Sequence, residues 1–221
     1  MSAPLFIPTA EAAFIAGLTD RQMNRVVDER LVPETLFAQR GSSRLFTRLG
    51  AAFAKFYFAT EDMLIAGARR QVLEELAARV ERLPAKKKES TSRLAQLHTV
   101  SWKVERQFVA VDVLPFIQDV SNRAREVDQA DALVTVDNDV MGGTPVFAGT
   151  RVPIDIVLGS LAASIDTRDV KEAYPFLTAA HIQAAKVYEE VHPRRGRPRR
   201  IAEVHPELPR RVTRVVKRAA A

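Results

Sequence analysis

The chain has 221 residues, 47% of them apolar, and a formal net charge of +6. This length and composition suffice for one or two domains with a buried core. The lack of cysteine excludes disulfides, thiolate zinc sites and cysteine nucleophiles, and it suits a reducing cytoplasm. No apolar run approaches the roughly 20 residues that span a bilayer, and the N-terminal residues lack the pattern of a secretory signal. We therefore expect a cytoplasmic protein without a membrane partner.

The positive charge is concentrated at the C-terminal end. Residues 194–221 hold 10 basic and 2 acidic side chains, whereas residues 1–83 sum to +1 and residues 84–193 to −3. A basic arm of this kind indicates a polyanionic partner, either nucleic acid or an acidic protein surface. The polar run Pro84–Ser92 predicts a loop or linker. We divide the chain into a first part, 1–83, a second part, 94–192, and the arm, 193–221.

The first part begins with a pattern of two short helices and a hairpin. Thr9 is the expected N-cap of the first helix, and Gly17 its C-terminal glycine. Thr19 with Gln22 forms the pattern of a capping box that starts the second helix. After Pro33, residues 36–47 alternate about a Gly-Ser-Ser turn, which predicts a β-hairpin.

Residues 5–47 resemble the winged helix-turn-helix of MerR-like regulators, through Thr9, Glu11-Ala-Ala13 and the Gly-Ser-Ser-Arg-Leu hairpin. The resemblance implies DNA binding by the second helix and the wing, although similar helix pairs also occur in proteins that never bind DNA. Asp20, Asp28 and Glu29 leave the second helix only weakly basic. The residue types suited to bases and phosphates are Thr19, Arg21, Gln22, Asn24 and Arg25 on the helix and Arg40, Ser43 and Arg44 on the wing.

Further helices are predicted over residues 49–58 and 61–83. The second has an apolar stripe from Leu64 to Val80, which indicates either a dimer seam or packing onto the core. In the second part we expect a strand over 102–113, a helix over 114–127, a strand over 133–136 and a turn at Asp137-Asn-Asp139. A short strand at Val146-Phe147 and helices over 154–165, 167–174 and 178–191 follow.

Residues 140–153 read Val-Met-Gly-Gly-Thr-Pro-Val-Phe-Ala-Gly-Thr-Arg-Val-Pro, and Tyr174, Pro175 and Leu177 form a later turn. Together they resemble a small bacterial domain, covering about residues 132–192, that is common in VapB-type antitoxins. The resemblance implies a PIN-domain ribonuclease toxin as partner. Arginines of the arm would then pair with the carboxylates of the toxin's metal site. The residues concerned are Arg194, Arg195, Arg197, Arg199 and Arg200.

Two other interpretations of the arm remain open. Gly196-Arg-Pro198, flanked by arginines, resembles the core of an AT-hook, which binds the DNA minor groove. The arm also fits a solvated basic tail. Arg151, at the strand-to-helix corner, is expected to hold Asp155 or a backbone carbonyl.

No catalytic set is evident. The four histidines, His98, His181, His192 and His205, lack the spacing of a zinc site, and no phosphate-binding loop is present. Asx turns explain Asp137 and Asp139 better than a metal does.

We expect an α+β, mostly helical protein that is not an enzyme and needs no cofactor. Its predicted function is that of a type II antitoxin. It would inhibit a PIN-domain ribonuclease and, as a homodimer within a hetero-oligomer, repress its own operon at operator DNA. The alternative is a stand-alone regulator whose winged unit and tail both contact DNA.

Overall fold

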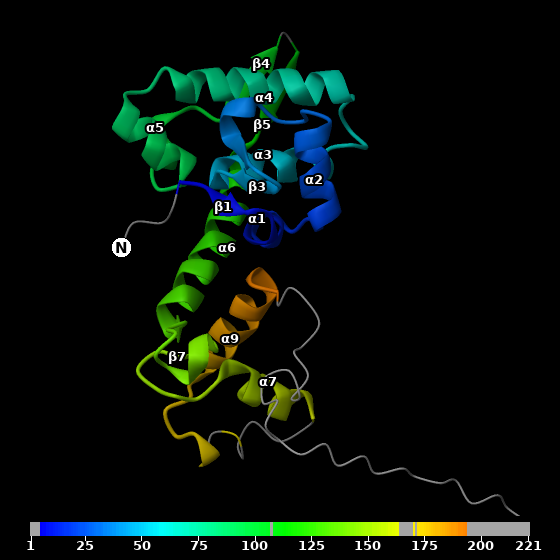
Figure 1. The fold of residues 1–221 in the computed structure, drawn as a ribbon. Helices are drawn as coiled ribbons and strands as arrows, with labels where there is room; N and C mark the ends of the chain where they lie inside the picture. Colours follow the sequence, from blue (N-terminus) through cyan, green and yellow to red (C-terminus); the bar gives the residue numbers. More distant parts are fainter. Residues whose placement is uncertain (1–4, 107, 164–169, 171, 194–221) are drawn as a thin grey trace, which may run out of the picture.

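The fold has two lobes joined by one long helix. A computed structural model describes residues 5–106, 108–163, 170 and 172–193. The described chain is α+β and mostly helical, as predicted. Helix α6 (Leu114–Leu133) runs from the larger lobe, which contains the elements from β1 to β5, into the smaller lobe with β6, β7, α7 and α9 (Figure 1). No helix in the described part of the chain is both long and apolar enough to cross a membrane.

The larger lobe begins with β1 (Ile7–Pro8), α1 (Thr9–Ala16) and α2 (Asp20–Asp28). After the 3₁₀ helix η1 (Glu34–Leu36), strands β2 (Phe37–Arg40) and β3 (Ser43–Phe46) form the predicted hairpin. The antiparallel sheet has the order β1-β3-β2.

The predicted ends of the first two helices are largely confirmed. Gly17 ends α1 at a φ of 67°, and Thr19 and Gln22 form the capping box of α2. The prediction that Thr9 caps α1 is wrong. Pro8 occupies the N-cap position, and the Thr9 hydroxyl instead donates to the carbonyl of Arg44 across 3.1 Å. This hydrogen bond ties the start of α1 to β3.

Three helices and a second hairpin complete the larger lobe. Helix α3 (Arg48–Ala59) lies near the centre, and α4 (Ala66–Glu81) and α5 (Ala85–Ser92) follow it. The expected linker at Pro84–Ser92 is wrong, because α5 occupies it and buries Thr91 and Ser92. The single strand expected over 102–113 is also wrong. Beyond the 3₁₀ helix η2 (Leu97–Thr99), this region folds back on itself as β4 (Lys103–Arg106) and β5 (Val109–Asp112).

The apolar stripe of α4 packs within the chain. Leu73 and Leu76 are both 0% exposed in the single chain, so they belong to the core of the larger lobe. Leu73 and Leu76 therefore do not form a dimer seam in the folded chain. The helix is also shorter than predicted, because residues 60–65 form a turn in which Leu64 donates to the carbonyl of Thr60.

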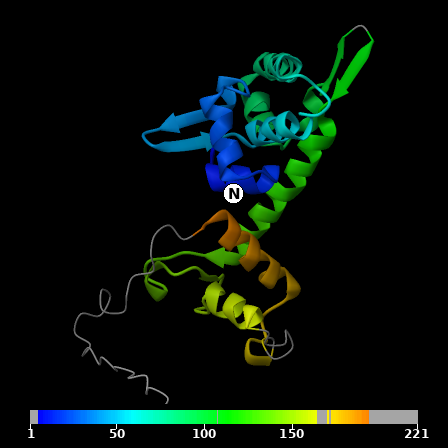
Figure 2. The ribbon, with the colours of Figure 1, turned by 90° about the vertical axis from the view of Figure 1, so that its right-hand side faces the viewer.

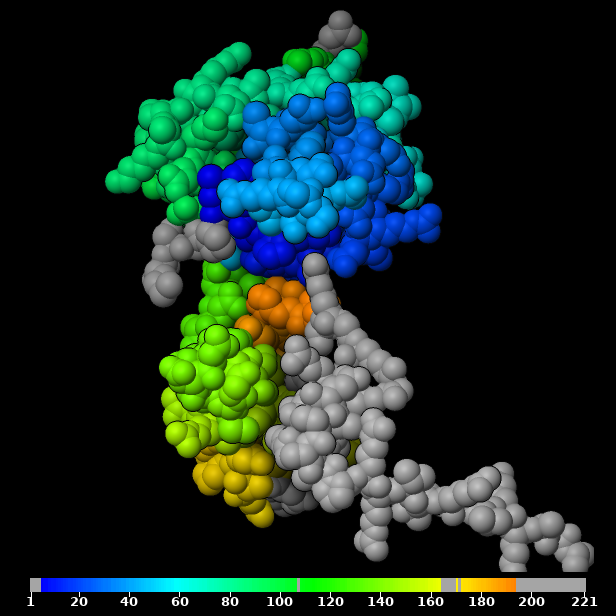
Figure 3. All heavy atoms as spheres, in the orientation of Figure 1, coloured from blue at the N-terminus to red at the C-terminus, as the bar shows by residue number. Residues whose placement is uncertain are grey.

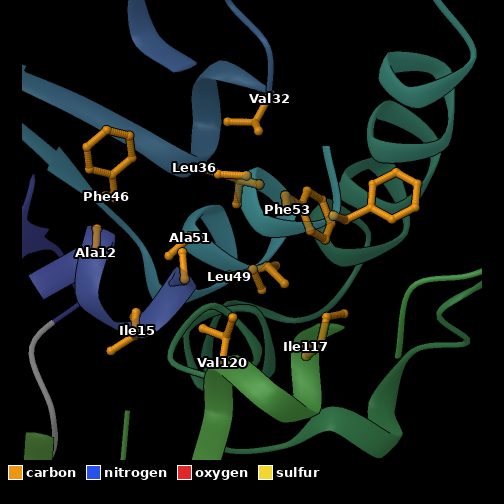
Figure 4. Close-up of a cluster of buried hydrophobic side chains, with 14 of the residues drawn as sticks. Ala12, Ile15, Val32, Leu36, Phe46, Leu49, Ala51, Phe53, Ile117 and Val120 are labelled. Carbon is orange, nitrogen blue, oxygen red and sulfur yellow. The ribbon is translucent and has the colours of Figure 1, made fainter. Parts of the chain in front are cut away.

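The larger hydrophobic cluster extends from Ile7 in β1 to Ala130 in α6 and adds Ala184, Val187 and Val191 of α9. In Figure 4, side chains from η1, α1, α3 and α6 converge, with Leu49 and Phe53 of α3 near Ile117 of α6. Residues 94–130 contribute to this same cluster. The domain boundary expected near residue 84 therefore lies inside one core and does not divide the chain into two domains.

The smaller lobe follows α6, which continues to Leu133 rather than ending at residue 127, because Val127 and Ala130 extend its buried face. Its elements are β6 (Val134–Thr135), the 3₁₀ helix η3 (Met141–Gly143), β7 (Val146–Phe147), α7 (Ile154–Ala162) and α9 (Ala179–Val191). The predicted turn is present, because Leu177 donates to the carbonyl of Tyr174. Half of the helix expected over 167–174, namely residues 167–169 and 171, lies outside the described residues.

A buried guanidinium connects three helices of the larger lobe. Arg48, at the start of α3, pairs with Asp128 of α6 at 2.6 and 2.9 Å and with Glu11 of α1 at 3.4 Å. The Arg48 side chain is only 5% exposed. Burial raises the pKa of Glu11 above its usual value, although Arg48 acts in the opposite direction. The pair of Arg48 with Asp128 is stronger than its pair with Glu11, because it has two short parallel hydrogen bonds instead of one long one.

Helix α3 approaches η1 closely at Gly50. A Cβ atom at Gly50 would lie 2.6 Å from the carbonyl oxygen of Leu36, so the backbone would have to move. Gly50→Ala should therefore lower the free energy of unfolding by about 1–3 kcal/mol, the usual cost of overpacking. Gly67→Ala in α4 is the matched control, because a Cβ there meets nothing within 4 Å. It should leave stability unchanged or raise it, since alanine favours a helix. Urea unfolding measures both, and equal effects of the two variants would contradict the close contact.

Candidate nucleic-acid interface

Helix α2 and the β2–β3 hairpin form one exposed surface of the larger lobe. The hairpin projects from the lobe (Figure 2) and lies on the face seen in Figure 3. A hollow of about 610 Å³ lies between the first turns of α2 and the hairpin. Its lining is mostly polar and comprises Pro8, Thr9, Asp20, Asn24, Ser42, Ser43, Arg44 and Leu45. Among these residues, Asp20, Ser42 and Ser43 are exposed, and Asn24 is partly exposed.

The turn of the hairpin is short and fixed. Arg40 pairs with Ser43 in the strand register, which leaves only Gly41 and Ser42 in the loop. Gly41 takes a φ of 59°, a conformation that two-residue hairpin turns favour. The sequence prediction did not include Ser42 among the site residues, although its place in the Gly-Ser-Ser turn was the signal for it.

Arg44 is an internal anchor. Its guanidinium pairs with both carboxylate oxygens of Asp28 at 2.7 and 3.2 Å and donates to the carbonyl of Asn24 at 3.2 Å. A bidentate pair fixes orientation as well as distance. Arg44 therefore sets the position of the hairpin relative to α2, and its charge is largely offset by Asp28.

Three other predicted residues also have partners inside the chain. Thr19 and Gln22 are hydrogen-bonded to each other in the capping box. Arg25 forms a bidentate pair with Glu29, at 2.8 and 3.1 Å, and lies over the ring of Phe58. Hydrogen bonding between the two raises the pKa of Arg25 and lowers that of Glu29. Thr19, Gln22 and Arg25 therefore already have hydrogen-bond partners within α2 and its cap residues before any ligand is bound.

Two predicted arginines remain available. Arg21 on α2 and Arg40 on β2 are exposed, and neither side chain has a hydrogen bond or ion pair within the described residues. Neither arginine lines the hollow itself, but Arg21 lies on the helix and Arg40 on the hairpin that border it. The predicted site is thus brought together by the fold, but only part of it faces outward unpaired.

The remaining candidate residues do not extend this surface. Arg194, Arg195, Arg197, Arg199 and Arg200 lie outside the described residues. The amide of Asp139 donates to the carboxylate of Asp137, which is the expected Asx turn. Within the part of the chain that the structure describes, no three histidine or acidic side chains cluster as metal ligands.

Comparisons with known proteins match both lobes. A family model described as "Protein of unknown function (DUF433)" matches residues 134–188. This range holds a second buried apolar cluster, in the smaller lobe, which comprises Val134, Phe147, Ile154, Val157, Val170, Leu177 and Ala185. "Uncharacterized protein y4eO" of Sinorhizobium fredii (strain NBRC 101917 / NGR234) is 33% identical over 196 residues, which cover 87% of this chain and 84% of that protein. The chain therefore belongs to the same family as the S. fredii protein.

One solved structure is also similar in part. The X-ray crystal structure of Rv2018 from Mycobacterium tuberculosis is 18% identical to this chain, with a TM-score of 0.35. The match covers 84% of this chain and 99% of that one.

The role of Arg44 can be tested without any ligand. Arg44→Met should keep the chain folded but lower the protection of the β2–β3 amides against hydrogen exchange, because the hairpin loses its link to α2. Arg40→Met is the matched control and should leave protection unchanged, since its guanidinium has no partner among the described residues. Equal protection in both variants would show that Arg44 does not hold the hairpin.

Proposed function

We propose that the chain is a DNA-binding regulator in which α1, α2 and the β2–β3 hairpin act as a winged helix-turn-helix. The observation that carries the proposal is the polar hollow between the first turns of α2 and the hairpin. In helix-turn-helix proteins, the N-terminal residues of the second helix contact base edges in the major groove. Arg21 and Asn24 occupy those turns, and Arg40 and Ser43 lie on the adjoining wing.

The charge of this surface predicts a modest affinity for each protomer. The charge of Arg44 is offset by Asp28, and that of Arg25 by Glu29. Arg21 and Arg40 are therefore the cations that can contact phosphate. Each phosphate contact contributes about 0.9 to the slope of log K against log salt. A homodimer on a two-fold operator would double both the contacts and the slope.

The Arg21→Ala/Arg40→Ala double variant should weaken binding to the DNA upstream of the chain's own gene. It should also reduce the salt slope by about 1.8 for each protomer, because two phosphate contacts are lost. Fluorescence anisotropy over a series of salt concentrations measures both quantities. Arg82→Ala is the matched control, since Arg82 is exposed at the end of α4 next to α5. If the double variant behaves like the control, α2 and the hairpin do not bind DNA.

We further propose that the protein is a type II antitoxin whose arm inhibits a PIN-domain ribonuclease. Support comes from the resemblance of residues 132–192 to the VapB-type domain and from the 10 basic side chains within residues 194–221. Arginine pairs with carboxylates through two parallel hydrogen bonds, so an arginine arm suits a nuclease centre built from acidic residues. The stand-alone regulator is the alternative, and in that case the arm would bind DNA.

Removal of residues 194–221 separates these two functions. The antitoxin should lose inhibition of the ribonuclease encoded beside its gene and keep operator binding, whereas the stand-alone regulator should lose DNA affinity. Arg195→Ala or Arg197→Ala should cost about 2–5 kcal/mol of toxin binding, because it leaves buried carboxylates unpaired. Lys86→Ala, an exposed change in α5, is the control and should cost less than about 1 kcal/mol. A truncated chain that still neutralises the ribonuclease would contradict this role for the arm.

A further inference from the structure

A second hollow lies in the larger lobe, between the first half of α6, the base of the β4–β5 hairpin and the η2 segment. Its volume of about 570 Å³ falls within the range of small-molecule sites. It is separate from the α2 surface, because the two hollows share no lining residue.

The hollow has an apolar floor and a polar rim. Leu94 and Trp102, which are 6% and 3% exposed, form buried parts of the lining, and Leu97 and Leu114 are partly exposed beside them. The indole of Trp102 donates to the carbonyl of Leu97 at 2.7 Å, so the floor is held in place. The exposed rim residues include His98, Gln118 and Arg125.

Three polar side chains from one face of α6 line this hollow without using their hydrogen-bonding capacity. Gln118, Ser121 and Arg125 follow at intervals of three and four residues, which places them on the same side of a helix. None of the three side chains has a hydrogen bond or ion pair within the described residues. Ser121 is only 5% exposed as a residue, and it lines the hollow between Gln118 and Arg125 on this face of α6.

The charges around the hollow leave one cation uncompensated. Lys103 pairs with Glu105 at 2.7 Å, and Asp112 is near enough that its carboxylate also helps to raise the pKa of Lys103, after the larger effect of Glu105. Asp112 in addition accepts a hydrogen bond from the amide of Leu114 at 2.9 Å. Lys103 and Asp112 are thus occupied, and Arg125 is the cation that remains for a ligand.

We propose that this hollow binds a small organic acid with one carboxylate and an apolar body. The carboxylate pairs with Arg125, while Ser121 and Gln118 donate hydrogen bonds to its oxygens. The apolar body lies over Leu94 and Trp102. A single negative charge matches the single uncompensated guanidinium, whereas a phosphate dianion would find no second free cation among the lining residues.

Trp102 is the only tryptophan of the chain, so its indole reports directly on the hollow. Hexanoate and phenylacetate, added separately to the full chain, are the test ligands, and the ¹⁵N–¹H signal of the indole is the readout. At least one of the two acids should shift this signal saturably. The corresponding amide, which has the same body but no charge, should bind at least about tenfold more weakly, because charge-assisted hydrogen bonds are the stronger kind. Inorganic phosphate should cause no saturable shift.

Variants assign the contacts. Arg125→Gln should weaken binding of the acid by about tenfold or more and binding of the amide much less, since the acid alone loses a charge-assisted pair. Ser121→Ala should cause a smaller loss for the acid. Arg82→Gln, which lies outside the hollow, is the control and should bind like the unaltered chain.

The proposal is overturned if neither acid shifts the indole signal saturably. It is also overturned if acid and amide bind equally, or if Arg125→Gln binds the acid as tightly as Arg82→Gln does. Circular dichroism of each variant checks that the fold is retained. For Arg125→Gln we expect this result because residue 125 is exposed.

Discussion

The larger lobe depends on the buried guanidinium of Arg48. Arg48 stands at the start of α3 and holds Asp128 of α6 and Glu11 of α1 at the same time. A buried charge without partners costs several kcal/mol, so the three helices must meet in this one arrangement. Two further contacts repeat the α3–α6 link along the same pair of helices. Lys55 pairs with Asp119, and the ring of Phe56 packs edge-on against Phe116. Helix α6 is thereby fixed to the core that carries α1 and α2.

This attachment determines where the two surfaces lie. One end of α6 carries the hollow beside Trp102, and the other end packs against α9 in the smaller lobe. The ring of Trp102 packs edge-on against Phe53 of α3, which places that hollow next to the central helix of the lobe. Helix α2 and its hairpin are held on a different side, by Arg44 and by the hydrogen bond from Thr9 to the carbonyl of Arg44. The proposed DNA surface is therefore preorganised by contacts that use up some of its own charges.

Local signals in the sequence predicted the elements whose ends are set by nearby residues. Gly17, the capping box of Thr19 with Gln22, and the Gly-Ser-Ser turn all act within a few residues, and each was confirmed. The failures arose from contacts between distant residues. Pro84–Ser92 reads as a polar linker, yet α5 forms there and buries Thr91 in the core. Likewise, the alternating pattern over 102–113 does not show that Lys103–Arg106 pairs with Val109–Asp112 as an antiparallel hairpin.

The candidate site was predicted only by residue type. A sequence shows that arginines occur on α2 and the hairpin, but it does not show which of them are neutralised by partners. The pairing of Arg44 with Asp28 joins residues 16 positions apart and needed the structure to be seen. Arg44 and Arg25 have acidic partners within the chain, whereas Arg21 and Arg40 have none among the described residues. This difference, rather than the number of basic residues, distinguishes the groups available to the proposed DNA partner from those that hold the surface together.

The most direct measurement is an NMR titration of the ¹⁵N-labelled full chain with a DNA duplex from upstream of its own gene. We expect the largest shifts at the amides of residues 19–25 and 40–44, on α2 and the hairpin. The amides of α7 and α9 in the smaller lobe should move little. Shifts confined to the smaller lobe, or no shifts at α2 and the hairpin at saturating DNA, would contradict DNA binding by α2 and the hairpin.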